Sequence, residues 1–172
     1  MRLNYTILYH DTKRTSYTDA LVKSILAYNN SPSTIERFYQ RIYELKSDHI
    51  VFIYEKGTPA GYILVKNIDS EGSQCELHLH AFKPEYRMSM MMFIYKHKFT
   101  QTVFYKLYEN INTFHLFPSK TLIGNVKDSF FKRLFQACTD MLLVKHPLPE
   151  SIISKRPDIG AYFILSRGAS YA

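Results

Sequence analysis

Three side chains that can exchange protons alternate along one short stretch of the chain. Glu76, His78 and His80 stand two residues apart in the sequence CELHLHAF, which covers positions 75–82. Residues two apart in an extended strand project from the same face, so these three are expected to share one face of a sheet. A carboxylate or a neutral imidazole placed in this way can take a proton from an incoming ammonium group. The pattern therefore predicts general-base chemistry, with Glu76 or His78 as the base, acting directly or through water.

The same three side chains allow two other interpretations. Imidazoles on a central strand can line a polar groove, or can pack beside neighbours that satisfy their hydrogen bonds. A His-x-His pair on a strand can also direct two imidazoles at a metal ion. The surrounding sequence supplies no third ligand at a suitable spacing, and we predict no metal site.

The chain leaves this strand through the sequence FKPEYRMSMMM, which predicts a turn and a helix that begins near Arg87. The free amides and the positive dipole end of a helix N-terminus attract anions such as phosphate. The methionine run that follows suits either a core or an adhesive surface for a protein partner. Helical spacing joins Met88, Met91, Met92 and Tyr95 in one stripe, which leaves Met90 off the stripe and exposed.

The elements that must position these residues follow a mixed order. Strands are expected over residues 3–9, 50–55, 60–66, 74–82, 112–117, 139–145 and 160–167, and helices over 16–29, from a capping box at 33–36 onward, 87–110 and 125–137. Seven strands and four helices imply an α/β fold, a mixed and mostly antiparallel sheet flanked by helices. Prolines at positions 147, 149 and 157 exclude regular structure from much of the last connection, whose length suits a substrate lid or a docking element.

Composition limits the class of protein. The chain has 172 residues, of which 46% are hydrophobic, so we expect a single domain over residues 1–172 with a sizeable core. The net charge of +7 favours anionic partners, either phosphorylated cofactors, acidic proteins or nucleic acid. The basic residues are dispersed, which fits solvated helix faces better than a nucleic-acid surface. Two cysteines, a polar N-terminus and the lack of any apolar run of about 18 residues predict a soluble, cytoplasmic protein without a membrane association.

The element order and two motifs resemble the Gcn5-related N-acetyltransferase (GNAT) superfamily. The sequence GTPAGYILV resembles the family's hairpin, with Gly61 at its usual glycine, and ELHLHAFKPEYR resembles its central strand and the exit from it. The resemblance covers most of the chain by element order and these two stretches by motif. It implies acetyl-coenzyme A as the cofactor and an amine as the substrate. It also implies Glu76 or His78 as the base and backbone amides of Ala81 and Phe82 facing the thioester oxygen.

The resemblance further implies that Arg87, Ser89 and Met90 bind the cofactor diphosphate and that Asn125 is a second cofactor contact. Met90 and Met92 occupy the two positions where the family has glycine or alanine. A residue without Cβ lets a phosphate approach the helix amides closely, whereas a thioether arm fills that space. We therefore expect the cofactor cradle to be blocked or reshaped.

Two classes of function stay open. The helix that follows Asn125 often carries, in this family, a tyrosine that protonates the departing thiolate, and Phe130, Phe131 and Lys132 occupy that region here. The protein is then either a divergent acyl-CoA-dependent N-acyltransferase or a non-catalytic protein that keeps the fold and binds a protein partner. Small basic domains rich in Tyr and Phe with altered acetyltransferase motifs resemble bacteriophage proteins, which predicts head or virion assembly in the host cytoplasm. Titration with coenzyme A distinguishes the two classes.

Overall fold

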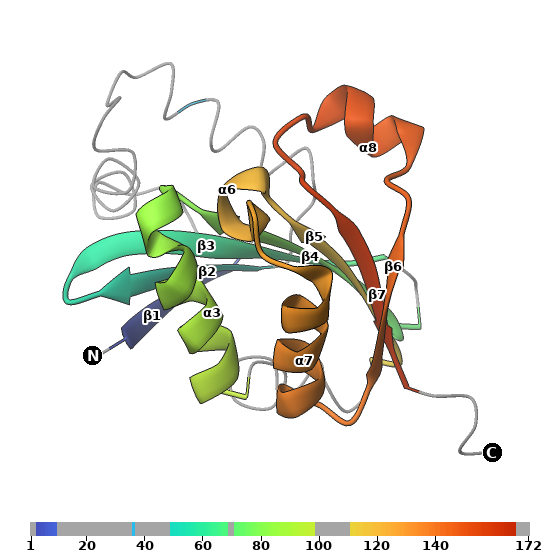
Figure 1. Cartoon of the computed structure of the whole chain (residues 1–172), viewed down its shortest axis with the longest axis horizontal. Helices are drawn as coiled ribbons and strands as arrows, with labels where there is room; N and C mark the ends of the chain where they lie inside the picture. Colours follow the sequence, from blue (N-terminus) through green and yellow to red (C-terminus); the bar gives the residue numbers. More distant parts are fainter. Residues whose placement is uncertain (1–2, 10–35, 37–48, 69–70, 99–110, 168–172) are drawn as a thin grey trace.

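The computed structural model describes residues 3–9, 36, 49–68, 71–98 and 111–167, which are the coloured parts of Figure 1. The two helices expected between residues 16 and 48 lie almost wholly outside these ranges. The helix expected over residues 87–110 ends earlier, at Lys96, and Lys98 then adopts a positive φ of 41°, which is incompatible with a continuing α-helix. Residues 99–110 lie outside the described ranges.

Seven strands form one sheet in the described residues (Figure 1). Its members are β1 (Leu3–Tyr9), β2 (His49–Glu55), β3 (Thr58–Asn67), β4 (Gln74–Ala81), β5 (Thr113–Pro118), β6 (Leu142–His146) and β7 (Tyr162–Ser166). The strand order is β1-β2-β3-β4-β5-β7-β6. The pairing of β4 with β5 is parallel, and the other five pairings are antiparallel. The expected mixed, mostly antiparallel sheet is confirmed.

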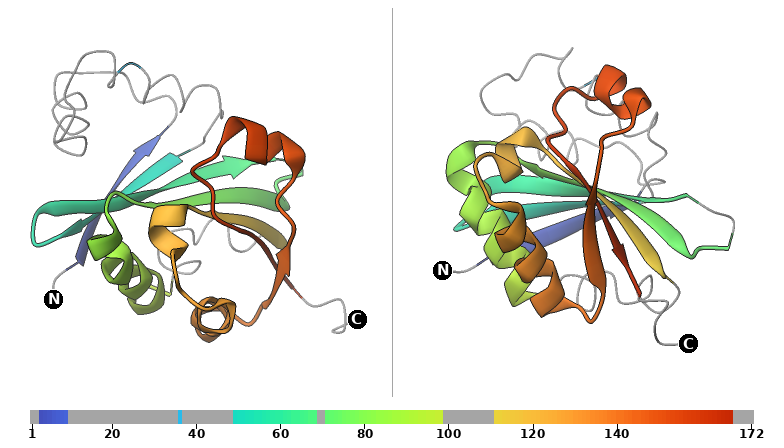
Figure 2. Two further views of the ribbon diagram at one scale, coloured as in Figure 1. Left: turned by 45° about the horizontal axis from the view of Figure 1, so that its top comes forward. Right: turned by 45° about the vertical axis from the view of Figure 1, so that its right-hand side comes forward.

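Four α-helices and one 3₁₀-helix are described, namely η1 (Pro84–Tyr86), α3 (Arg87–Lys96), α6 (Lys120–Ile123), α7 (Asp128–Cys138) and α8 (Glu150–Lys155). Figure 2 shows α3 and α7 together on one face of the sheet, with α8 away from them on the other side. The apolar core lies between the sheet and these two helices. Its β4 members, Cys75, Leu77, Leu79 and Ala81, are fully buried and alternate with Glu76, His78 and His80. The prediction that the three polar residues share the opposite face is confirmed.

Two short helices correct the sequence expectation. The connection from β6 to β7 contains α8, although prolines were expected to prevent regular structure there. Pro149 is the N-cap of α8, and Pro157 lies beyond its end, so neither proline removes a hydrogen bond inside the helix. The one-turn α6 was not expected, and it is capped by the Ser119 hydroxyl, which accepts from Leu122 N at 3.1 Å.

The methionine run divides between two faces of α3. Met90 and Met91 are buried, whereas Met88 is 56% exposed and Met92 is also exposed. The expectation that Met90 is exposed is wrong. Its side chain lies against Gly61 of β3, where an added Cβ would come within 2.6 Å of the Met90 Sδ. Because Gly61 has no side chain, Met90 can occupy the space beside it.

Candidate functional site

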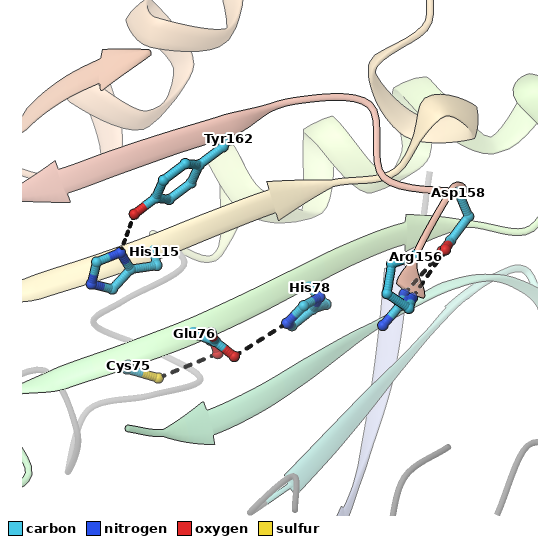
Figure 3. A network of polar contacts seen from close by, with 7 residues as sticks. All are labelled: Cys75, Glu76, His78, His115, Arg156, Asp158 and Tyr162. Atoms are coloured by element: carbon cyan, nitrogen blue, oxygen red, sulfur yellow. Dashed lines mark hydrogen bonds and ion pairs between the residues drawn. The ribbon is translucent and has the colours of Figure 1, made fainter. Parts of the chain in front are cut away.

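Glu76 and His78 form a polar pair on β4, on the face opposite the core (Figure 3). His78 Nε2 lies 3.5 Å from Glu76 Oε2. The imidazole is 3% exposed and stacks on Phe117 of β5, with ring centroids 5.0 Å apart. Burial lowers the pKa of His78 below its ordinary value, although the hydrogen bond with Glu76 opposes this effect. His78 is therefore neutral at neutral pH.

The protonation states of this pair follow from its surroundings. Burial tends to raise the pKa of Glu76, but the hydrogen bond with His78 and the charge of Lys66 lower it to below its ordinary value. An ionised carboxylate can only accept a hydrogen bond, so the proton of the neutral imidazole sits on Nε2. The other nitrogen, Nδ1, then carries a free lone pair. It is buried and makes no hydrogen bond to any part of the chain that the structure describes.

His80, the third member of the alternating trio, lies in a different environment. Its ring centroid is 4.9 Å from that of Tyr62 on β3 and 5.9 Å from that of Phe82. Tyr62 and Phe82 also contact each other, at 5.5 Å. His80 thus belongs to an aromatic cluster beside the Glu76–His78 pair.

Neighbouring strands add groups that the sequence did not single out. The parallel register places His115 of β5 opposite Glu76, and His115 Nδ1 lies 2.6 Å from the hydroxyl of Tyr162 on β7. His115 Nε2 lies 3.0 Å from Gln74 Oε1. Burial and the charge of Glu76 raise the pKa of Tyr162, so its hydroxyl stays protonated. The hydroxyl donates a hydrogen bond to His115 Nδ1. The alternation of Thr113, His115 and Phe117 along β5 was the signal that could have found this group.

A partly buried ion pair completes the polar face. Arg156, which follows α8, is 7% exposed and donates from Nε and Nη2 to the two carboxylate oxygens of Asp158, both at 2.9 Å. The sequence presents Arg156 as half of a basic pair with Lys155, and of these two only Lys155 is exposed. Nothing in the local pattern distinguishes the two residues.

β4 extends beyond the end of β5, which determines the direction of a backbone amide. Pairing of the two strands ends at Leu79 and Pro118, where Leu79 O accepts from Ser119 N at 2.8 Å. On the other side, Phe82 N donates to Ala60 O at 3.0 Å. Antiparallel residues alternate between bonded and non-bonded pairs, so the next pair, Ala81 with Gly61, is non-bonded. The N–H of Ala81 therefore faces away from β3, past the end of β5, whereas the N–H of Phe82 is already engaged.

The residues expected to bind a cofactor divide into two groups. Arg87 lies over the start of α6, with its Nε 3.5 Å from Thr121 O and its guanidinium against Gly124. Asn125 is the next residue after Gly124 and is exposed, so Arg87 and Asn125 come together at one end of the helical layer. Ser89 is buried and donates its hydroxyl to Glu55, and Met90 is buried as described above. The side chains of these last two turn away from the surface.

An apolar groove lies between α3 and α7. Its volume is about 330 Å³. The residues that line it are Met88, Met91, Met92, Tyr95, Phe130, Arg133, Leu134 and Ala137. The exposed methionines of α3 thus share one surface with Phe130. Phe130 lies in the region where the GNAT resemblance implies a tyrosine.

The described residues contain no group of three or more His, Cys, Asp or Glu side chains that could hold a metal ion. None of their helices is long and apolar enough to cross a membrane.

Comparisons with known proteins bear on the fold. No protein-family model and no curated protein matches the sequence. A chimera of the spermidine N-acetyltransferase SpeG from Vibrio cholerae with hSSAT is similar in structure, with a TM-score of 0.51 and 13% identity over 96% of each chain. A putative GNAT-family acetyltransferase from Desulfovibrio desulfuricans gives a TM-score of 0.50 at 11% identity, over 96% of this chain and 99% of that one. Campylobacter jejuni PseH in complex with acetyl coenzyme A gives 0.48 at 16% identity, over 96% and 100%. The similarity to the first two structures shows that the protein has a GNAT-like α/β fold.

Proposed function

We propose that this protein is an N-acyltransferase that moves an acetyl or related acyl group from coenzyme A to an amine. The observation that carries the proposal is the exit of β4. There the N–H of Ala81, which points away from β3 and past the end of β5, follows on the same strand an ionised Glu76 bonded to a neutral His78. A hydrogen-bond donor for an oxyanion and a base for an ammonium are the two groups that acyl transfer requires.

The base in this proposal is Nδ1 of His78, and Glu76 is its positioning residue. Glu76 holds the imidazole in the tautomer that leaves Nδ1 free, and its charge stabilises the imidazolium once Nδ1 has taken a proton from the amine. Bound acyl-coenzyme A would supply the thioester carbon for attack by the amine, with coenzyme A leaving as the thiol. Ala81 N–H would donate to the thioester oxygen as negative charge develops there, and His78 would then release its proton to solvent or to the departing sulfur.

The turn before α3 is compatible with a diphosphate. The side chain of Met90 was expected to fill the cradle, but its thioether packs inward against Gly61. Arg87 and Asn125 stand together at this end of the helical layer, as the proposed diphosphate contacts require, and the net charge of +7 favours an anionic ligand. Ser89 would contribute its backbone amide rather than its side chain, whereas the amide of Met90 donates to the carbonyl of the N-cap residue Tyr86 as the first hydrogen bond of the helix.

Thermal-shift titration with acetyl-coenzyme A tests the proposal. A ligand that binds the native state at 100 times its Kd stabilises it by about 2.7 kcal/mol, so we expect a melting temperature that rises with cofactor concentration. Arg87→Ala should shift the titration to higher concentrations, whereas Lys155→Ala, a control on exposed α8, should not. The absence of any shift at millimolar cofactor would rule out the enzyme.

The alternative function is a non-catalytic protein, such as a phage-encoded virion-assembly factor, that binds a protein partner. The exposed apolar groove between α3 and α7 favours it, since large apolar patches mark interaction surfaces. It predicts no response to coenzyme A and a stable complex with a larger protein, so the same titration decides between the two. Under either function we propose that residues 1–172 act as one domain.

A further inference from the structure

The connection between β6 and β7 places a buried cation beside the Glu76–His78 pair. Burial lowers the pKa of Arg156, but the hydrogen bonds and charge of Asp158 have the larger, opposite effect. The pKa therefore lies above its ordinary value, and the guanidinium stays charged. Its charge is close enough to His78 to lower the pKa of that imidazole. Figure 3 shows Arg156 and Asp158 near His78, at the end of β4.

This cation stands on a rigid support. Lys120 N donates to Asp158 O at 2.8 Å, and Gly160 N donates to Pro118 O at 2.9 Å. A β-bridge joins Ile159 to Ser119 between these two bonds. The segment that follows Arg156 is thereby fixed to the end of β5 and the start of α6. A binding group supported in this way is preorganised.

Two buried polar atoms at this place lack hydrogen bonds. Asp158 occupies Nε and Nη2 of Arg156, and the third nitrogen, Nη1, is buried without a partner in the described residues. The same holds for Nδ1 of His78. Buried polar atoms in native proteins are nearly always hydrogen-bonded. Two such exceptions close to each other indicate that a ligand completes the site.

The chemistry of Arg156 at one end of the site, and of Glu76 and His78 at the other, defines that ligand. Nη1 of a guanidinium carries two N–H donors and no acceptor, and its best partner is a carboxylate oxygen. An ammonium group would meet like charge there. At the other end, the ionised Glu76 attracts an ammonium, and Nδ1 of neutral His78 can accept its proton. The site therefore has one end for an anion and one for a cation.

We propose that the acceptor substrate is an amino acid, whose carboxylate binds Nη1 of Arg156 while its amino group faces His78 and Glu76. The transfer of an acyl group to that amine rests on the proposed function, but the recognition of the carboxylate does not. Spermidine, which appears in the name of a structurally similar protein, is a polyamine without a carboxylate. The proposal thus gives this protein a different acceptor class.

The first experiment uses the wild-type chain without cofactor. The twenty standard amino acids are titrated by calorimetry beside their decarboxylated amines, such as lysine beside 1,5-diaminopentane and histidine beside histamine. We expect at least one amino acid to bind about tenfold or more tightly than its amine, because a lost charged hydrogen bond has a cost of that order. Equal binding of all pairs, or tighter binding of amines and spermidine, would overturn the proposal.

The second experiment compares Arg156→Gln with Lys155→Gln, which removes the same charge from the exposed neighbouring position. Arg156→Gln should reduce the preference for the acid about tenfold or more, while Lys155→Gln should keep it. The acetyl-coenzyme A thermal shift should persist in both variants. An unchanged preference in a folded Arg156→Gln protein would contradict the assignment. If that variant does not fold, by circular dichroism, the wild-type comparison decides alone.

The acyltransferase proposal and the amino-acid proposal would fail in different ways. Loss of the acetyl-coenzyme A response in the wild-type protein, with amino-acid binding kept, would remove the acyltransferase and leave Arg156 as a carboxylate site. Acetyl transfer to amines with no preference for acids would keep the enzyme and remove the role of Arg156.

Discussion

At the scale of single residues, the Glu76–His78 pair divides one chemical task between two side chains. The ionised carboxylate accepts from Nε2 and so selects the tautomer, which makes Nδ1 the atom that can accept a proton. His78 stacks on Phe117, and this contact restricts rotation of the imidazole out of that orientation. The two residues are therefore expected to respond differently to substitution.

We expect His78→Gln to lower kcat by about 10²–10⁴-fold, the usual contribution of general acid–base catalysis. Glu76→Gln should lower kcat less, because Nδ1 remains. Steady-state thiol release with acetyl-coenzyme A and an acceptor measures both effects. His97→Gln is the control, since His97 lies at the end of α3, where its ring contacts Phe93. A variant at position 78 that kept full activity would exclude His78 as the base.

The pH profile of kcat/KM provides a second test of the same pair. The pKa of His78 lies below its ordinary value of 6.5, so activity should be level at neutral pH and fall only as the pH drops below that value. Glu76 raises the pKa of His78 through their hydrogen bond. Glu76→Gln removes this effect, so the acidic limb should move to lower pH. A limb that stayed in place would mean that His78 does not titrate in it.

At the scale of elements, the contact between β3 and α3 fixes the turn where a diphosphate would bind. Gly61 permits Met90 to enter the core, and Glu55 at the end of β2 accepts the Ser89 hydroxyl. The side chains of Ser89 and Met90 thus fix the first turn of α3 against β2 and β3. Its outer side is left to backbone groups and Arg87.

Gly61→Ala tests this contact. Its added Cβ would collide with the backbone carbonyl of His80, which has little freedom to move, and would press on Met90 Sδ. Overpacking of this kind costs about 1–3 kcal/mol, or roughly 2–12 °C of melting temperature for a chain of this size. Thr58→Ala, at an exposed position of the same strand, is the control. Equal melting temperatures for the two variants would show that Met90 does not depend on Gly61.

At the scale of the whole molecule, several imidazoles are held neutral by the folded state. Burial lowers the pKa of His78, His97 and His115 below 6.5. They lie on β4, after α3 and on β5, so protonation opposes the packing at three places. The unfolded chain binds protons at higher pH than these folded sites do.

The contribution of these three imidazoles to the free energy of unfolding should therefore be fully present above pH 6.5. It should be lost as the pH drops through their folded pKa values. The sign follows because between the two pKa values the unfolded state holds more protons than the native state. Melting temperatures at pH 7.5 and pH 5 measure the loss. His78→Gln, which removes one titrating group, should show a smaller loss than the wild-type protein. An equal loss would mean that other groups dominate.

Much of the fold was predictable from local sequence because its signals are local. The period of two in β4 follows from the geometry of an extended chain, and it also assigned Glu76 and His78 to one face. The helix start at Arg87 followed from a proline turn and a run of residues that permit helix. By contrast, the prolines of the last connection were misinterpreted, because their effect depends on where the helix begins relative to them.

Other features were decided only by contacts between distant parts of the chain. Helical spacing orders the methionines around α3, but the gap at Gly61 selects Met90 for the core. The N–H of Ala81, unlike that of Phe82, points past the end of β5, because β5 stops at Pro118 while β3 continues beside β4. Arg156 became a buried partner of Asp158 because its segment is bonded to the end of β5. The sequence by itself determined which residues could do chemistry on β4, and the tertiary structure decided which of them meet, since burial and pairing depend on neighbours that lie far away along the chain.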